Sequence, residues 1–135
     1  MASFKSNEVS IAKSNEIIYN FLSDFRNFEK LMPEQVTNWT SDGEKCSFTI
    51  QNMATLGMKY KSKSPFQLID IESEGNSPFP FNLQCNIHES GENSCRVMLQ
   101  FNAELSPMMM MMASRPLGNF VNILAEKLKE VSEAA

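Results

Sequence analysis

The sequence predicts an α+β domain in which an antiparallel sheet of about seven strands is covered by one long C-terminal helix. Apolar and polar residues alternate through most of the segment 35–105, and an apolar stripe of helical period runs from Leu117 to Val131. Such alternation is typical of a sheet that is exposed to water on one face and covered on the other. The chain therefore needs an element that covers the sheet, and the C-terminal stripe supplies it.

The N-terminal part of the chain is expected to form one strand, over residues 3–12, followed by two short helices. Ser14 is a suitable N-cap for the first helix, because a serine hydroxyl can accept a hydrogen bond from a free N–H of the first turn. Apolar residues then recur at helical spacing from Ile17 to Phe25. Pro33 ends the helical segment, because proline lacks the N–H that a helix interior requires.

The middle of the chain is expected to form strands joined by turns that contain Gly, Asn, Ser or Asp. The expected strands are 35–40, 45–53, 56–64, 65–74, 79–88 and 95–105, and the expected turns are 41–44, 75–78 and 89–93. Ser106 can then cap the long helix, and Pro107 suits its first turn. We expect Pro116 to kink or restart this helix.

Composition excludes several classes of function for this chain, which we treat as a single domain, residues 1–135. The net charge is −4 and the lysines are scattered, so the basic stripe of a nucleic-acid-binding protein is missing. No apolar run approaches the roughly 20 residues that span a bilayer, and the N-terminus lacks the apolar core of a secretory signal. We therefore expect a cytoplasmic protein.

The residues that usually carry catalysis or hold metals are sparse and widely spaced. Cys46, Cys85 and Cys95 have no zinc-ligand spacing and are expected to be buried, reduced thiols. His88 falls on the polar face of its strand, and no second histidine exists to form a nucleophile–base pair. Asp70 is expected to point outward between two isoleucines. No Gly-rich phosphate loop is present, so we expect no metal and no cofactor.

The element order, together with three local features, resembles a known superfamily. These features are the opening "VSIAKSNEIIYNFLSDFRNFEKLMP", the strand around Trp39, and the ending "FNAELSPMMMMMASRPLGNFVNILAEKL". The chain resembles the START-like (SRPBCC) superfamily of polyketide cyclase/dehydrase and lipid-transport-like proteins, and looks like one of its small bacterial members. The resemblance implies a helix-grip fold, in which a curved sheet wraps around the long helix with an apolar cavity between them.

From this resemblance and the inward positions of each strand, we predict a noncatalytic protein that binds or transports a small hydrophobic ligand, such as a lipid, polyketide or isoprenoid. The predicted ligand-binding residues share the inner face of the sheet or helix. They are Trp39, Phe48, Ile50, Met58, Tyr60, Phe81, Leu83, Leu99, Phe101, Met109, Met112, Leu117, Val121 and Leu124. An alternative is a cyclase or aromatase acting in the same cavity, with Tyr60, Asp70 and Arg115 as its polar groups.

The run Met108–Met112 is the one biased segment of the chain. Methionine fills irregular core gaps and also lines adaptable binding surfaces. At helical spacing Met108, Met109 and Met112 share one face, which leaves Met110 and Met111 pointing elsewhere. The alternatives are therefore core packing, a cavity wall, or a surface that docks a protein partner. A Cu(I) site is disfavoured, because no Cys or His lies nearby.

Overall fold

The computed structural model describes residues 2–51, 53–75 and 77–134 of the chain. Asn52 and Asn76, which fall in the expected strand 45–53 and turn 75–78, lie outside the described residues. The elements in chain order are β1 (Ala2–Lys5), β2 (Val9–Ile11), α1 (Asn15–Leu22), α2 (Phe25–Phe28), the 3-10 turn η1 (Glu29–Leu31), β3 (Val36–Ser41), β4 (Lys45–Ile50), β5 (Ala54–Ser64), β6 (Leu68–Ser73), β7 (Phe81–Gly91), β8 (Ser94–Ala103) and α3 (Pro107–Ala134).

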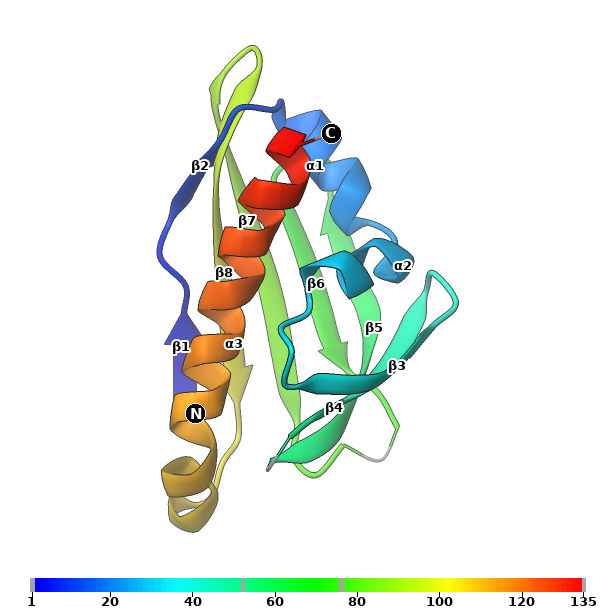
Figure 1. Ribbon diagram of the computed structural model, residues 1–135, viewed down its shortest axis with the longest axis vertical. Coiled ribbons are helices and arrows are strands. Elements are labelled where there is room, and N and C mark those ends of the chain that lie inside the picture. The colour runs from blue at the N-terminus through cyan, green and yellow to red at the C-terminus, as the bar shows by residue number, and fades with distance from the viewer. Residues whose placement is uncertain (1, 52, 76, 135) are drawn as a thin grey trace.

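The strands form one antiparallel sheet with α3 lying across it (Figure 1). The strand order is β1-β8-β7-β6-β5-β4-β3, and β2 also pairs with β8. The C-terminal turns of α3 lie beside the start of α1, where Glu133 Oε2 accepts a hydrogen bond from the backbone N–H of Ala12 at 2.9 Å. The N-terminal turns of α3 lie at the opposite end of the molecule (Figure 1). The predicted fold class is confirmed.

The expected first strand is interrupted at Ser6. Its N-terminal part, β1, pairs Lys5 with Gln100, and its second part, β2, pairs Val9 with Val97. Between them the Ser6 side chain joins the ladder, because Ser6 Oγ accepts a hydrogen bond from the Leu99 N–H at 2.9 Å. Between these two pairs, the N-terminal segment contains one residue more than the matching segment of β8. The N-terminal segment therefore bends, as a strand does at a β-bulge.

A second irregularity, in β3, determines which way Trp39 faces. Thr37 pairs with Thr49 and Thr40 pairs with Ser47, so three steps along β3 match two steps along β4. The extra residue falls at Asn38, whose φ is +56°. Without it Trp39 would share a face with Thr37. With it, Trp39 lies on the inner side and stacks on Phe48 with ring centroids 5.5 Å apart.

Helix α3 runs from Pro107 to Ala134 as one element, so Pro116 does not restart it. Ser106 Oγ accepts a hydrogen bond from the Met109 N–H at 3.2 Å, as expected of an N-cap. Pro116 lacks the N–H that would bond to the carbonyl of Met112 four residues earlier. Because Met112 is 63% exposed, water can reach that turn, which explains how the proline is tolerated inside the helix.

The irregularity in β3 gives a stability prediction. Asn tolerates a positive φ, whereas a β-branched residue is strained there by about 1–2 kcal/mol. We expect Asn38→Val to lower the free energy of unfolding by about that amount, measured by urea unfolding with Trp39 fluorescence. Thr37→Val, one position away in regular strand, is the matched control and should change stability by less than about 0.5 kcal/mol. Equal stability of the two variants would contradict the role given to Asn38.

Candidate functional site

The inner face of the sheet is apolar and buried. The register pairs Cys46 with Met58 across β4 and β5, and Leu83 with Phe101 across β7 and β8. Seven of the predicted ligand-binding residues lie on this face with 5% exposure or less: Phe48, Ile50, Met58, Phe81, Leu83, Leu99 and Phe101. Strand alternation therefore brings together the sheet part of the predicted set.

Helix α3 supplies the opposite wall. Leu117, Val121 and Leu124 are each 0% exposed, as the predicted stripe requires. Phe120 belongs to the same buried face and is 1% exposed, yet the predicted ligand-binding set omits it. Its helical spacing to Leu117 and Leu124 could have indicated that Phe120 faces the interior. Its ring contacts both Phe48 of β4 and Phe101 of β8.

A continuous series of aromatic rings crosses the interior from β3 to the segment before β7. In order, the rings of this aromatic series are Trp39, Phe48, Phe120, Phe101, Phe81 and Phe79. Phe48 stacks on Phe120 at 5.7 Å between ring centroids, and Phe120 meets Phe101 edge-on at 6.5 Å. Such ring pairs contribute about 0.5–1.5 kcal/mol beyond the area they bury. The series therefore fills and braces the space between sheet and helix.

Tyr60 lies at the edge of this interior and is held by three contacts. Its hydroxyl donates a hydrogen bond of 2.6 Å to the carbonyl oxygen of Leu22, at the end of α1. Its ring stacks on Phe25 at 4.1 Å, and Lys63 Nζ lies 4.1 Å from the ring centroid. Burial raises the pKa of Tyr60 far above its ordinary value. The hydroxyl proton is thus engaged in joining α1 to the sheet.

The methionine run divides between the core and the solvent. Met109 is partly buried against the core, and Ala113, one turn later, is 1% exposed. Met112 departs from the predicted interior set, because it is 63% exposed. The helix phase explains this: Ala113, Leu117 and Phe120 set the inward face, and Met112 lies about 100° away from Ala113 around the axis.

Met108, Met110 and Met111 are exposed by 73%, 39% and 86%. Together with Met112 they form an exposed apolar patch on the first turns of α3. Contiguous apolar exposure of this kind is typical of contact surfaces. A docking surface at the methionine run requires that Met110 and Met111 face solvent, and this condition is met. A protein partner at this surface stays a prediction.

Apart from Tyr60, the polar side chains considered for catalysis lie away from the interior. Asp70 points outward between the buried Ile69 and Ile71, and its Oδ1 accepts a hydrogen bond from Asn82 Nδ2 at 3.4 Å. His88 and Arg115 are both exposed. Within the described part of the chain, no three His, Cys, Asp or Glu side chains gather as a metal site.

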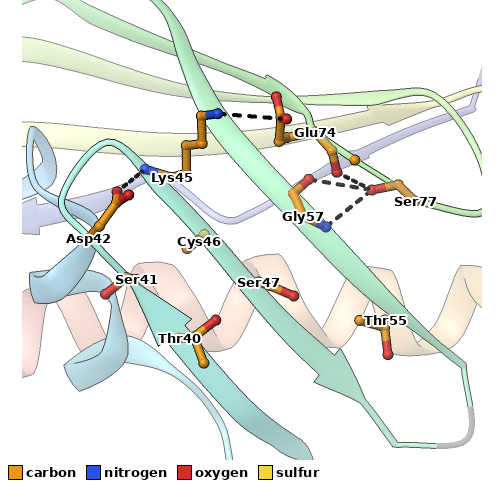
Figure 2. Close-up of a pocket in the computed structure, with 11 residues that line it drawn as sticks. Thr40, Ser41, Asp42, Lys45, Cys46, Ser47, Thr55, Gly57, Glu74 and Ser77 are labelled. Carbon is orange, nitrogen blue, oxygen red and sulfur yellow. Dashed lines mark hydrogen bonds and ion pairs between the residues drawn. The ribbon is translucent and has the colours of Figure 1, made fainter.

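Two hollows of the surface also lie away from the interior. One, of about 600 Å³, lies over β3, β4 and β5 (Figure 2). The other, of about 550 Å³, lies between the start of α1, the β5–β6 turn and β7. Sequence reasoning predicted neither, because both depend on how separate strands and turns approach one another.

With this geometry, comparison with known proteins identifies the fold. No family model and no curated protein matches the sequence. A START superfamily protein from Mycobacterium smegmatis superposes with a TM-score of 0.70 at 15% identity, covering 98% of this chain and 97% of that chain. A protein from Thermus thermophilus gives a TM-score of 0.73 at 15% identity, covering 98% of both chains.

Norcoclaurine synthase from Thalictrum flavum, in complex with dopamine and hydroxybenzaldehyde, gives a TM-score of 0.69 at 13% identity, over 96% of this chain and 85% of that chain. The fold is therefore that of the START-like proteins, as the sequence indicated. Among the described residues, no helix combines the length and apolarity needed to cross a membrane.

The division of the methionines predicts an order of oxidation. Thioethers that face solvent react with hydrogen peroxide to give sulfoxides, whereas buried ones are protected. We expect peptide mass spectrometry to find Met108, Met111 and Met112 oxidised well before Met58, which is 0% exposed. Unfolded protein is the control and should lose this order. Equal oxidation of Met58 and Met111 in folded protein would contradict the placement of α3.

The buried thiols predict a loss of stability at alkaline pH. Burial raises the pKa of Cys46 and that of Cys85 from 9.0 to about 12. Above pH 9.0 the unfolded chain releases these protons while the folded chain retains them, so the free energy of unfolding falls as pH rises toward 12. Urea unfolding over this range should show a steeper fall for wild type than for the Cys46→Ala, Cys85→Ala double variant. Parallel curves for wild type and the double variant would contradict the assignment of this pH dependence to Cys46 and Cys85.

Proposed function

We propose that the protein binds a small hydrophobic ligand, of the lipid, polyketide or isoprenoid kind, between the sheet and α3. The observation that carries this proposal is the aromatic series, which makes the interior apolar and rich in ring faces. An apolar interior selects ligands by shape and volume and adds orientation through few polar groups. The partly buried Tyr60 and Trp39 are polar-tipped side chains that pack against this core.

The packing of α3 supports a route into this interior. The helix packs directly on β8, β1, β2 and η1. It reaches β4 through the contact between Phe120 and Phe48. The seam between α3 and β3–β4 is therefore closed by side chains, whose rotamers change more readily than backbone contacts break. A ligand that enters here displaces rings and replaces their contacts with its own.

We favour binding without catalysis over the cyclase alternative. A general acid or base must lie within hydrogen-bond reach of the substrate. Asp70, His88 and Arg115 lie outside the interior, and the Tyr60 hydroxyl is already bonded to the Leu22 carbonyl. Loss of activity in Tyr60→Phe would therefore be ambiguous, because that variant also leaves a buried carbonyl unpaired.

Trp39 is the reporter for the test, because it is the single tryptophan and it stacks on Phe48 at the end of the aromatic series. Protein purified under native conditions is first analysed by native mass spectrometry, and any bound molecule is extracted and identified. Stripped protein is then titrated with oleate, farnesol and 1-anilinonaphthalene-8-sulfonate while Trp39 emission is recorded. We expect saturable changes with at least one of these probes.

Phe120→Leu tests whether the probe binds in the interior. The shorter side chain removes the ring that joins Phe48 to Phe101, so affinity should change about tenfold or more. Phe66→Leu, at a ring that is 38% exposed outside the interior, is the matched control and should leave affinity unchanged. The proposal fails if no molecule co-purifies and no probe alters Trp39 emission, or if the two variants behave alike.

A further inference from the structure

One buried polar side chain, near the C-terminal end of α3, has no hydrogen-bond partner. In the described part of the chain three polar residues are buried, namely Ser6, Asn102 and Ser132. Ser6 Oγ accepts a hydrogen bond from the Leu99 N–H at 2.9 Å. Asn102 Oδ1 accepts one from Ser3 Oγ at 2.7 Å. Ser132 Oγ differs from both, because no atom of the described residues bonds to it.

Ser132 continues the inward face of α3 by one more turn. It follows Leu128, which is 0% exposed, by four residues, and Ala125, which is 1% exposed, by seven. Residues at these spacings share one face of a helix. Ser132 itself is 6% exposed. Its hydroxyl is therefore buried on the side of α3 that carries the apolar stripe.

Contacts of the residues around Ser132 fix this end of α3. Lys129 Nζ donates a hydrogen bond to the Ser10 carbonyl at 2.5 Å. Glu133 Oε2 accepts one from the Ala12 N–H at 2.9 Å and another from Lys129 Nζ at 2.9 Å. The last turns of α3 are thus tied to β2 and to the segment before α1. A rotation of the helix that moved Ser132 would break these contacts.

The Ser132 hydroxyl keeps its full capacity for hydrogen bonding. A serine inside a helix often bonds to the carbonyl four residues earlier, but Ser132 Oγ does not bond to the Leu128 carbonyl. A hydroxyl offers one donor and two acceptor positions. Burial without a partner is costly, because the bonds to water are lost and not replaced. A bound molecule that bonds to this hydroxyl recovers that cost.

An apolar wall connects Ser132 with the aromatic series. Between Phe120 and Ser132 every buried residue of α3 is apolar, and Val121, Leu124 and Leu128 are each 0% exposed. The distance from Phe120 to Ser132 along the helix axis is about 18 Å, at about 1.5 Å per residue. The inward face of α3 therefore offers a long apolar surface with one polar end.

The polar end is uncharged. Among the described residues no charged side chain is buried. The side chains of Lys129 and Glu133 are 44% and 33% exposed, so their charges meet water. A carboxylate or ammonium group buried against a single hydroxyl would lose most of its hydration without an opposite charge to replace it. A neutral oxygen needs only one hydrogen bond.

We infer that Ser132 determines specificity in the apolar interior by bonding to a neutral oxygen, hydroxyl or carbonyl, at one end of a long apolar ligand. The chain of this ligand lies along α3 toward Phe120. The inference rests on the function proposed above. It narrows the ligand from hydrophobic molecules in general to apolar alcohols and carbonyl compounds, and it disfavours fatty acids.

Three farnesyl compounds test the inference: farnesol, its hydrocarbon analogue farnesene, and the carboxylate farnesoate. Affinities are measured by Trp39 emission for wild type and for Ser132→Ala. The ratio of farnesol affinity to farnesene affinity is compared between the two proteins, because the cost of removing the farnesol hydroxyl from water then cancels. We expect Ser132→Ala to lower this ratio about tenfold or more, since the ligand hydroxyl loses its partner. Wild type should bind farnesoate more weakly than farnesol.

Ser114→Ala is the matched control, because Ser114 belongs to the same helix but is only partly buried, and it should leave the ratio unchanged. Ser132→Ala should melt no lower than wild type, since it removes an unpaired buried hydroxyl, so unfolding does not explain a lost preference. An unchanged ratio in Ser132→Ala, as for a hydroxyl that only holds a buried water, overturns the inference and leaves the proposed function standing. Tighter binding of farnesoate than of farnesol overturns the neutral end. If none of the three compounds binds, the inference fails, and the co-purification and probe titrations above decide the proposed function separately.

Discussion

The contact between Phe48 and Phe120 is the interaction on which the interior of this protein depends. Helix α3 lies against β8, β1 and β2 at one side of the sheet, and the strands β3 and β4 curl around from the other side. The two halves meet where these rings stack, with centroids 5.7 Å apart. Because apolar contacts have no strong directionality, this ring pair can join β4 to α3 and still be displaced by another apolar body.

Much of this arrangement could be predicted from local sequence patterns. β7 alternates regularly from Phe81 to Ile87 and β8 from Cys95 to Phe101, so the inward residues of these stretches were identified correctly. The caps at Ser14 and Ser106 were also predictable, because capping depends on a side chain and a backbone N–H only two or three residues apart. Patterns of this kind need no knowledge of the rest of the fold.

The features that were not predictable depend on residues distant in the chain. Ser6 interrupts the first strand through a bond to Leu99, 93 residues away. The inward phase of α3 is set by how Ala113 and Phe120 pack, so five consecutive methionines could not reveal that Met112 faces out. The close approach of the Glu74 carbonyl oxygen to Gly57 is also a contact that neither residue indicates by itself.

The irregularity at Asn38 has a further consequence for how the molecule behaves at high concentration. β3 is an edge of the sheet, and an exposed edge can recruit a strand from another chain and start aggregation. The shift between Thr37 and Thr40 divides this edge into two stretches of two paired residues each, Val36–Thr37 and Thr40–Ser41. Stretches so short offer little template for a new strand. Asn38, which turns Trp39 inward, therefore also makes the β3 edge a poor starting point for fibre growth.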